Sequence, residues 1–456
     1  MKHKSIAKDF TQGNIFTQLL WFTLPFMAGN ALQVLYSTVD MVIVGKYVGT
    51  AGLSAVSQSS MIVNFVTMVC LGFSNAGQVL ISQALGAEKK KEVGEIIGTL
   101  FSVILLIGIS LSFVILIFQN GILDLMNIPT ESYVMSKEYL VICSSGLFFT
   151  AGYNMVSAVL RGLGDSKRPF LFIGIATVVN LVLDIVFTGY MGFGVAGAAY
   201  ATIIGQAVSF LFSLYYLYHN RHLLYFEFKK ENFVIRKKYC KTIFSLGTPM
   251  AIQSGCINLS MLYVNSLVNS VSVVASASFG VGVRIDDIFN KISQGLQYAA
   301  MPIISQNIGA KNKKRAVKTV YCTLLYSSAF TVMIIVVYLL YGEELFRMFS
   351  DDVLVHNMSS VFISAILWMF PALAIMRGTN AFIQGIGNAK LGMILSILDG
   401  VVLRIGLSWF FGIMLNWGFY GFVLGYGLAA YGCAIPGLIY FLSGKWKKRK
   451  SLADEI

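Results

Sequence analysis

Long apolar runs separated by short polar breaks make up most of this chain. A helix needs about 20 apolar residues to cross a hydrocarbon layer that is about 30 Å thick. Windows of this kind are centred near residues 27, 66, 106, 146, 179, 206, 256, 288, 330, 370, 403 and 431. The pattern therefore predicts twelve transmembrane helices.

Composition agrees with a membrane protein. Of the 456 residues, 56% are hydrophobic and only 12% are charged, whereas globular chains carry about 25% charge. The first apolar run, residues 15 to 38, is too long for a signal sequence and lacks a clear cleavage site, so we expect it to remain as helix 1. The six cysteines stand singly, and their spacing predicts neither a disulfide framework nor a zinc site.

The distribution of Lys and Arg orients the predicted helices. Of the 34 basic residues, 27 fall in the even-numbered loops and the two termini, and only 3 fall in the odd-numbered loops. Cytoplasmic loops retain an excess of these residues, so we expect both termini in the cytoplasm of a multi-pass protein of the cell inner (plasma) membrane. The net charge of +13 follows from this bias. The tail KWKKRK is interpreted as a contact with anionic membrane lipid, and no nucleic acid partner is expected.

Three motifs occur twice in the chain. ISQALGAEKKKE at 81–92 returns as ISQNIGAKNKKR at 304–315, RGLGDSK at 161–167 returns as QGIGNAK at 384–390, and GVAG at 194–197 returns as GFYG at 418–421. The offset is 223 or 224 residues each time. The chain is thus interpreted as two homologous six-helix halves of one orientation, related by a pseudo-two-fold axis along the membrane normal.

The repeat also predicts the domain organisation. We expect an N-lobe of residues 1–222 with helices 1 to 6 and a C-lobe of residues 223–456 with helices 7 to 12, joined by a cytoplasmic linker at about 219–241. Gly86 and Gly309 are expected to end the helices that enter the repeated loops. Rocking of two such lobes is a physical route to alternating access.

Motifs for other functions are absent or out of context. The chain has no Walker pattern GxxxxGK[ST], so active transport is expected to use an ion gradient or a separate ATPase subunit. GFGVAG at 192–197 matches GxGxxG, but it lies in a short loop and not after a strand, so dinucleotide binding is not predicted. DDIFN at 286–290 lacks the second acidic box of a membrane prenyltransferase. We expect no enzymatic activity and no cofactor, and we found no selectivity loop of a channel.

Carboxylates within a membrane are costly and mark functional sites. The predicted helices contain five: Asp40, Asp184, Asp286, Asp287 and Asp399. Asp287 and Lys291 are spaced for an internal ion pair, and Asp399 and Arg404 are a second candidate pair. The sequence leaves the roles of Asp286, Asp287 and Asp399 open.

Asp40 and Asp184 have no basic neighbour within one or two helical turns. Each therefore needs a partner on another helix, a proton or a metal cation. A buried hydrogen-bond network that only fixes the packing is the alternative. The repeat favours function, because the offset places Tyr263 and Leu407 at the equivalent positions of the second half. An acid that the fold requires would be present in both halves.

Other polar residues share the faces of these two acids. Gln33, Tyr36, Ser37 and Asp40 form one polar stripe on helix 1. Asn180 and Asp184 share a face of helix 5, Thr202 lies on helix 6, and Asn154 on helix 4 can point to the same interior. Pro25 sits within helix 1, where it removes a backbone hydrogen bond and creates either a hinge or a tolerated kink.

These residues resemble those of the MATE multidrug and toxin extrusion transporters. The likeness spans nearly the whole chain and rests on several motifs: YSTVDMVIVG at the end of helix 1, RGLGDSKRP after helix 4, NLVLD in helix 5, GVAGAAYAT entering helix 6, and ISQNIGA in the second half. The resemblance implies an all-α fold of two six-helix bundles. It also implies efflux of organic, often cationic, compounds in exchange for Na⁺ or H⁺.

The resemblance also implies site residues. A cation-binding and coupling site falls on Asp40, Asn180, Asp184 and Thr202, with Asp40 and Asp184 as Na⁺ ligands if sodium drives exchange. Gln33, Tyr36 and Asn154 would line the adjoining substrate cavity, and Pro25 would be the hinge of helix 1.

The chain departs from one branch of the family. Residues 243 to 270 contain no acid and helix 10 carries Arg377, which resembles the DinF-like branch, with coupling in the N-lobe, more than the NorM-like branch.

The hypothesis is an antiport cycle in which a proton or Na⁺ at Asp40 and Asp184 shifts helix 1 and displaces a small organic substrate. The alternative is a flippase for a lipid-linked oligosaccharide or another lipid-like substrate, which the few buried basic residues disfavour. A monomer suffices for either function. The sequence names neither the substrate nor the coupling ion.

Overall fold

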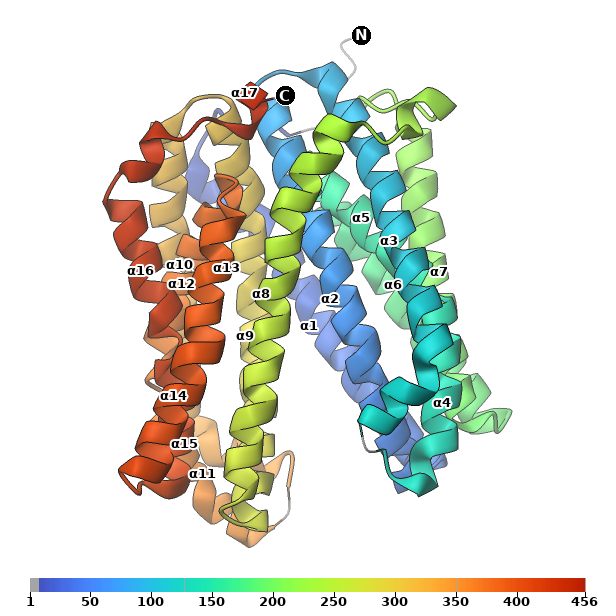
Figure 1. Cartoon of the computed structure of the whole chain (residues 1–456), viewed down its shortest axis with the longest axis vertical. Coiled ribbons are helices and arrows are strands. Elements are labelled where there is room, and N and C mark those ends of the chain that lie inside the picture. The colour runs from blue at the N-terminus through green and yellow to red at the C-terminus, as the bar shows by residue number, and fades with distance from the viewer. Residues whose placement is uncertain (1–7, 127, 351, 456) are drawn as a thin grey trace. The chain divides into compact units, whose positions relative to one another are not determined.

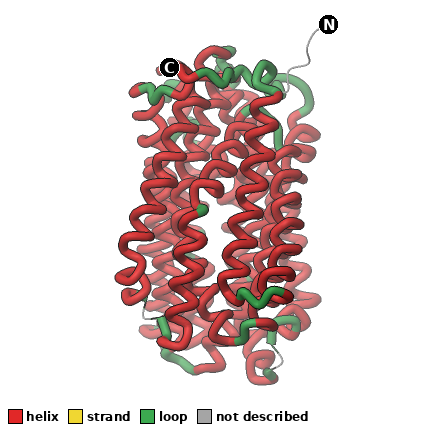
Figure 2. The backbone as a smooth tube through the Cα atoms, turned by 90° about the vertical axis from the view of Figure 1, so that its right-hand side faces the viewer, coloured by secondary structure: helices red, strands yellow, loops and turns green. Residues whose placement is uncertain are grey.

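The computed structural model describes residues 8–126, 128–350 and 352–455. Over these residues the chain consists of helices and connecting loops, without a strand (Figure 2). Such a composition suits a membrane, because a helix satisfies its own backbone hydrogen bonds where water is absent. The predicted all-α fold is confirmed.

The first half of the sequence forms six spans. Their helices are α1 (Ile15–Tyr47), α2 (Thr50–Gly86), α3 (Lys90–Leu125), α4 (Thr130–Ser145), α5 (Leu147–Gly162), α6 (Lys167–Asp184) with the π-helix η1 (Ile185–Tyr190), and α7 (Gly194–His219). A short 3-10 helix, η2 (Lys230–Phe233), lies in the predicted linker.

The second half repeats this order. Its long helices are α8 (Lys237–Asn269), α9 (Val273–Gly309), α10 (Lys313–Arg347), α11 (Val353–Ile366) and α12 (Met369–Gly385). The next span joins α13 (Ala389–Ile397), the π-helix η3 (Leu398–Leu403), α14 (Arg404–Trp409) and the π-helix η4 (Phe410–Met414). The chain ends with α15 (Gly418–Leu428), α16 (Tyr431–Leu442), η5 (Lys445–Lys448) and α17 (Leu452–Glu455) (Figure 1).

The spans match the predicted windows. In the described part of the chain, eight helices are long and apolar enough to cross a membrane, and ten if each bent pair counts as one span. The bent pairs are α4 with α5, at 47°, and α11 with α12, at 49°. Helices α8 and α9, of 33 and 37 residues, are equally long but more polar. With them the count reaches the twelve windows of the sequence.

The repeated glycines have equivalent backbone roles in both halves. Gly164 and Gly387 have φ values of +90° and +75°, and Gly194 and Gly418 have φ values of +58° and +55°. Residues other than glycine rarely adopt this left-handed region. The repeated motifs therefore mark turns whose backbone geometry requires glycine.

The loops after α2 and α9 confirm one prediction and refine it. Helix α2 ends at Gly86 and α9 ends at Gly309, as expected. The left-handed residues, however, are Glu88 at φ 61° and Lys311 at φ 57°, two positions further along. The glycines thus end the helices without supplying the positive φ of the turn.

Contacts group the chain into two units that differ from the two sequence halves. The first unit contains Ala28–Ala251, and the second contains Phe10–Met27 with Ile252–Glu455. The boundaries fall within α1 and α8, two residues after Pro25 and Pro249. The predicted lobes at 1–222 and 223–456 follow the repeat, whereas these units follow the contacts, so the two divisions describe different properties.

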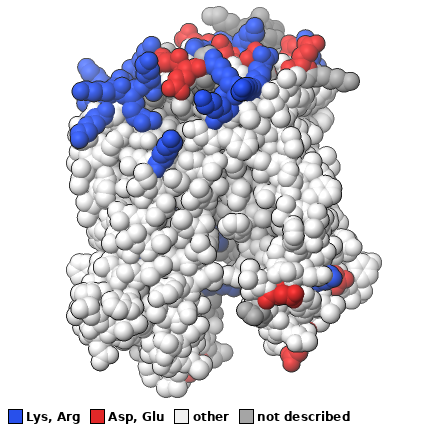
Figure 3. Space-filling view, viewed as in Figure 1, with Lys and Arg blue, Asp and Glu red and all other residues white. Residues whose placement is uncertain are grey.

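In each unit taken by itself, basic side chains gather at one end. On the face seen in Figure 3, the Lys and Arg side chains of each unit lie mainly at one end of that unit. In the sequence, basic residues are grouped where α2 ends and α3 begins, at the start of α10 and in η5. Apart from a few charged side chains at the opposite end of the first unit, most of the remaining visible surface is uncharged, as a lipid-facing surface requires.

Candidate cation site in the first unit

Two carboxylates and an amide meet where α1, α6 and α7 pack together. Asp40 lies on α1, whereas Asn180 and Asp184 lie one turn apart on the buried face of α6 that packs along α7. All three are buried, with Asp184 only 1% exposed. Asp184 is the last residue of α6 before the π-helix η1 begins. Single π-turns of this kind are frequent at functional sites.

The side chains predicted from the sequence contact one another. The carboxyl groups of Asp40 and Asp184 adjoin each other, and Asn180 adjoins Asp184. Tyr36 lies beside both carboxyl groups and beside the hydroxyl of Thr202. The tertiary structure therefore unites residues from three helices that are separated by up to 166 positions in the chain.

Many polar atoms of this cluster have no hydrogen-bond partner among the described residues. They are Oδ1 of Asp40, both side-chain polar atoms of Asn180, both carboxylate oxygens of Asp184, and Oγ1 of Thr202. Leaving such a buried group unpaired costs about 1–3 kcal/mol, and an unpaired buried group in a native protein calls for an explanation such as a water or an ion. A closed hydrogen-bond network, the structural alternative, would pair these atoms with one another.

A small cavity adjoins the cluster. It has a volume of about 30 Å³ and is lined by Gln33, Tyr36, Ile173, Ala176, Thr177, Asn180, Thr202, Gly205 and Gln206. A cavity holds a water molecule once its volume exceeds about 10–15 Å³, so this one has room for a water molecule or a small ion.

Two of the three residues expected to line the adjoining substrate cavity, Gln33 and Tyr36, line this small cavity. Asn154 lies half-buried on α5 and is not among the lining residues, and Ser37 bonds to the backbone oxygen of Val34. Gln206 was missed, although its spacing of four from Thr202 places both on one face of α7.

The chemistry of the cluster fits a hard monovalent cation or a proton. The available ligand atoms are carboxylate, amide and hydroxyl oxygens, which such cations prefer. Among the described residues, no group of three or more His, Cys, Asp and Glu side chains could hold a metal ion. A bound cation would therefore depend on the neutral oxygens of Asn180 and Thr202 as well as on the two carboxylates.

The other three intramembrane acids have partners in the second unit. Asp287 pairs with Lys291 at 3.2 Å, and both side chains are about half exposed. Asp399 pairs with Arg404 at 3.1 Å within a buried setting. Asp286 accepts a hydrogen bond from the hydroxyl of Tyr338 at 2.6 Å. Both ion pairs proposed from the sequence are confirmed.

The pairing of Asp399 with Arg404 depends on a π-helix. Arg404 lies five positions after Asp399, a spacing that in an α-helix places two side chains on different faces. The π-helix η3 spans Leu398–Leu403 and has more residues per turn, so it brings position i+5 back beneath position i. Sequence spacing alone does not reveal this local rewinding.

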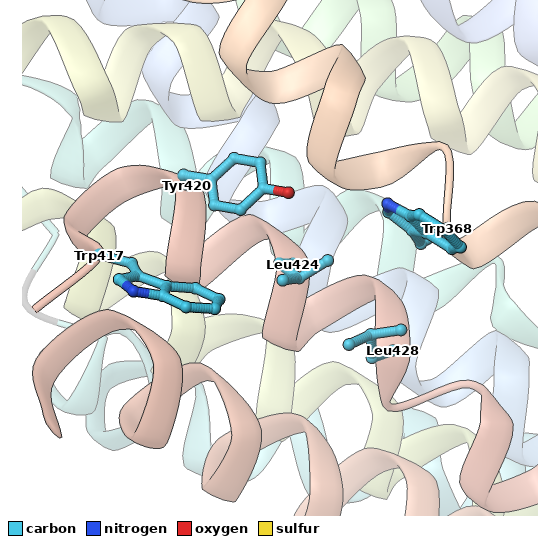
Figure 4. A pocket seen from close by; sticks show the side chains of 5 residues that line it. All are labelled: Trp368, Trp417, Tyr420, Leu424 and Leu428. Atoms are coloured by element: carbon cyan, nitrogen blue, oxygen red, sulfur yellow. The ribbon is translucent and has the colours of Figure 1, made fainter. Parts of the chain in front are cut away.

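A much larger cavity lies elsewhere in the second unit. Its volume is about 670 Å³, and Trp368, Trp417, Tyr420, Leu424 and Leu428 line it. In Figure 4, Trp368 lies on one side of the cavity, opposite Trp417 and Tyr420. The lining has no ionisable acid or base, and both tryptophans are about half exposed. Trp and Tyr of this kind are enriched at membrane–water interfaces, so the cavity is interpreted as a lipid-facing surface.

Close packing at Gly205 provides a test of the cluster's geometry. A Cβ atom at Gly205 would lie 3.1 Å from both Cβ of Asn180 and the backbone oxygen of Ala176. We expect Gly205→Ala to displace α6 and to lower the initial rate of efflux from proteoliposomes several-fold, because overpacking costs about 1–3 kcal/mol. The matched control is Gly174→Ala on α6, where nothing lies within 4 Å of the added atom. Equal rates for the two variants would contradict the prediction.

The fold and the site define a class of protein: a multi-pass helical membrane protein built from two repeats, with two adjoining buried carboxylates, Asp40 and Asp184, in the first of them. The MatE family model matches the chain twice, at residues 25–186 and again at 249–410, in agreement with the repeat. The chain belongs to the MATE family of membrane transporters.

Several curated relatives are similar over most of their length. The "Probable multidrug resistance protein YpnP" of Bacillus subtilis is 31% identical over 98% of this chain and 100% of its own. The "Probable multidrug resistance protein NorM" of Thermotoga maritima is 27% identical over 96% and 94%. The "Multidrug export protein MepA" of Staphylococcus haemolyticus is 24% identical over 86% of each chain.

Solved structures share the fold. A structure described as "Crystal structure of MATE in complex with MaL6" matches with a TM-score of 0.92 at 21% identity, over 98% of this chain and 100% of the other. A transporter from Pyrococcus furiosus matches with a TM-score of 0.91 at 21% identity, over 98% and 100%. Its description reads "Reverse polarity of binding pocket suggests different function of a MOP superfamily transporter". At these identities the likeness shows the fold alone.

Proposed function

We propose that this chain is a secondary active multidrug efflux transporter, which exports organic, often cationic, compounds in exchange for H⁺ or Na⁺ by alternating access. The observation that carries the proposal is the cluster of Asp40, Asp184, Asn180 and Thr202, whose oxygens lack protein partners among the described residues. The relatives named for multidrug resistance or export support the same substrate class.

In the proposed cycle, this chain's residues bind the coupling ion and transmit its effect. Asp40 and Asp184 take up a proton or Na⁺, and Asn180 and Thr202 supply neutral oxygens to it. Because Asp40 lies on α1, neutralising its charge changes the balance of forces on that helix, and Pro25 supplies the hinge. The shift of α1 then displaces the substrate. The protein is a monomer in this proposal and carries out no chemical reaction.

The proposed setting is the plasma membrane, with both termini in the cytoplasm. The support is the excess of Lys and Arg in the loops and termini of that side, 27 against 3. The alternative of a flippase for lipid-linked substrates gains no support from the three relatives named above, all of which are described as multidrug proteins.

The test imposes the two gradients separately on purified protein in liposomes. With a fluorescent organic cation as substrate, we expect efflux under either a Na⁺ gradient or a pH gradient, and its loss when an ionophore collapses that gradient. The two gradients are the energy sources of the proposed exchange, and the chain has no Walker pattern of its own. Efflux that continues after collapse would indicate a passive pathway. Folded protein that transports no cation but moves a labelled lipid would favour the flippase.

A further inference from the structure

The second unit contains a buried guanidinium without a carboxylate partner. Arg377 lies on α12 and is 5% exposed. Its Nε donates to Oγ of Ser293 at 3.0 Å, and one Nη donates to Oδ1 of Asn290. The other Nη lies 3.5 Å from Oε1 of Gln297. All three partners lie on one face of α9 and are neutral.

The three acids of this unit that lie within predicted spans are engaged elsewhere. Asp399 pairs with Arg404, Asp287 pairs with Lys291, and Asp286 accepts a hydrogen bond from Tyr338. No ion pair of Arg377 is present among the described residues. A buried charge without a counter-charge is costly, and within a membrane segment it marks a functional site. The positive charge is therefore available to an anionic group.

A cavity adjoins the guanidinium. It is lined by Phe289, Asn290, Ser293, Ser327, Thr331, Ile334, Phe370, Leu373 and Arg377, and its volume is about 10 Å³. The hydroxyls of Ser327 and Thr331 add polar groups, while two phenylalanine rings form apolar walls. At this volume the cavity is at the lower limit for a single water molecule, so a carboxylate can enter only by replacing contacts that Arg377 makes now. The lining suits the charged end of a ligand whose body is aromatic.

The internal repeat relates Arg377 to a residue of the first half. Arg377 lies 223 residues after Asn154, so the same position is neutral in one half and cationic in the other. Asp40 and Asp184 of the first unit are buried without an ion-pair partner among the described residues, and so is Asp286 of the second unit, which accepts a hydrogen bond from Tyr338. The second half thus carries a buried positive charge at a position that is neutral in the first half. A ligand that carries a carboxylate can pair with this charge, whereas a simple cation cannot.

We propose that Arg377 is a specificity-determining residue that binds the carboxylate of aromatic zwitterionic substrates. The planar fork of a guanidinium matches a carboxylate with two parallel hydrogen bonds. The long contacts at 3.5 Å, to Oε1 of Gln297 and to the backbone oxygen of Asn290, are the weakest that Arg377 makes. Exchanging them for a carboxylate replaces weak neutral contacts with charge-assisted ones. The proposal rests on the proposed function, since the ligand is a transported compound.

The test compares a zwitterionic dye with its own ester. Purified protein is titrated without any gradient, by fluorescence anisotropy, with rhodamine B, which has a carboxylate, and with rhodamine B methyl ester, which does not. We expect Arg377→Gln to lower the affinity for rhodamine B by about tenfold and the affinity for the ester by less than about twofold. The reason is that only rhodamine B loses a charge-assisted hydrogen bond. Arg377→Lys retains the charge without the fork and should give an intermediate loss.

Controls separate the proposal from a purely structural role of Arg377. Lys291→Gln removes an exposed basic residue from the neighbouring helix α9 and should change neither affinity. An equal loss for dye and ester in Arg377→Gln, or no loss for either, would overturn the proposal. Replacing gluconate by chloride in the buffer tests whether a free anion competes for Arg377. If chloride displaced both dyes to the same extent, the assignment of the carboxylate to Arg377 would also be overturned. Because binding is measured without transport, a failure of ion coupling in the wild type is seen separately.

Discussion

Asp184→Asn is expected to abolish gradient-driven efflux in proteoliposomes while leaving the protein folded. Asparagine has nearly the same shape as aspartate, but it cannot carry the negative charge that binds a proton or Na⁺ at this position. The carboxylate is 1% exposed and both its oxygens lack hydrogen-bond partners among the described residues. We expect the rate to fall at least about tenfold, the range typical when a required charge is lost from a buried site.

Stability distinguishes this mechanism from a structural role of the cluster. A buried carboxylate is costly in a membrane, so replacing it with a neutral amide should leave the thermal midpoint unchanged or raise it. If the cluster only fixed the packing, the variant would lose stability and transport together. Transport that remains intact in correctly inserted Asp184→Asn would contradict the coupling role.

The matched control is Asp287→Asn in the second unit. This residue is also an acid within a predicted span, but its side chain is 55% exposed and paired with Lys291. Exposed ion pairs contribute only about 0–1 kcal/mol, so both the efflux rate and the thermal midpoint should stay near those of the wild type. Loss of efflux in this variant as well would contradict a coupling role that is specific to the cluster on α1 and α6.

Arg404→Met is expected to have the largest effect on stability, because it leaves Asp399 buried without its counter-charge. The pair is separated by 3.1 Å with side-chain exposures of 9% and 2%, and Arg404 also stacks over the ring of Tyr426. Breaking a buried pair by removing one partner costs about 3–5 kcal/mol. The free energy of unfolding in mixed micelles measures this loss.

Two further variants serve as controls for this stability measurement. The double variant Asp399→Leu with Arg404→Met removes both charges and should recover much of the lost stability, since a hydrophobic replacement of a buried pair is often neutral. Lys291→Met breaks the exposed pair with Asp287 and should cost no more than about 1 kcal/mol. Equal losses for Arg404→Met and Lys291→Met would show that burial does not govern the strength of these pairs.

Much of the fold follows from the sequence because its signals are local or repeated. A membrane span is defined by about 20 consecutive apolar residues, so all twelve windows correspond to helical segments of the structure. The fourth and tenth spans, however, are each broken by a bend of nearly 50°. A bend depends on how the side chains around it pack; Gly146, for example, lies so close to Ile203 that a Cβ would meet its side chain at 2.7 Å. Hydropathy does not record such contacts.

The residues of the candidate site were likewise only partly predictable from the sequence. The sequence singled out Asp40 and Asp184, because acids without basic neighbours stand out within apolar helices. It did not include Gln206, and Asn154, which it assigned to a substrate cavity, is not among the residues that line the small cavity beside the cluster. The face of a helix can be read from spacing, but which faces meet is decided by the packing of helices distant in the chain.

The sequence by itself determined the membrane class, the number of spans, the repeat and the unusual acids, since each depends on composition or on periodicity along the chain. Only the tertiary structure decided that Asp40 on α1 meets Asp184 on α6, and that the contact units divide inside α1 and α8. It also decided that a π-helix aligns Asp399 with Arg404. The physical reason is that local patterns fix which side of a helix avoids lipid, whereas distances between helices depend on the simultaneous packing of many side chains.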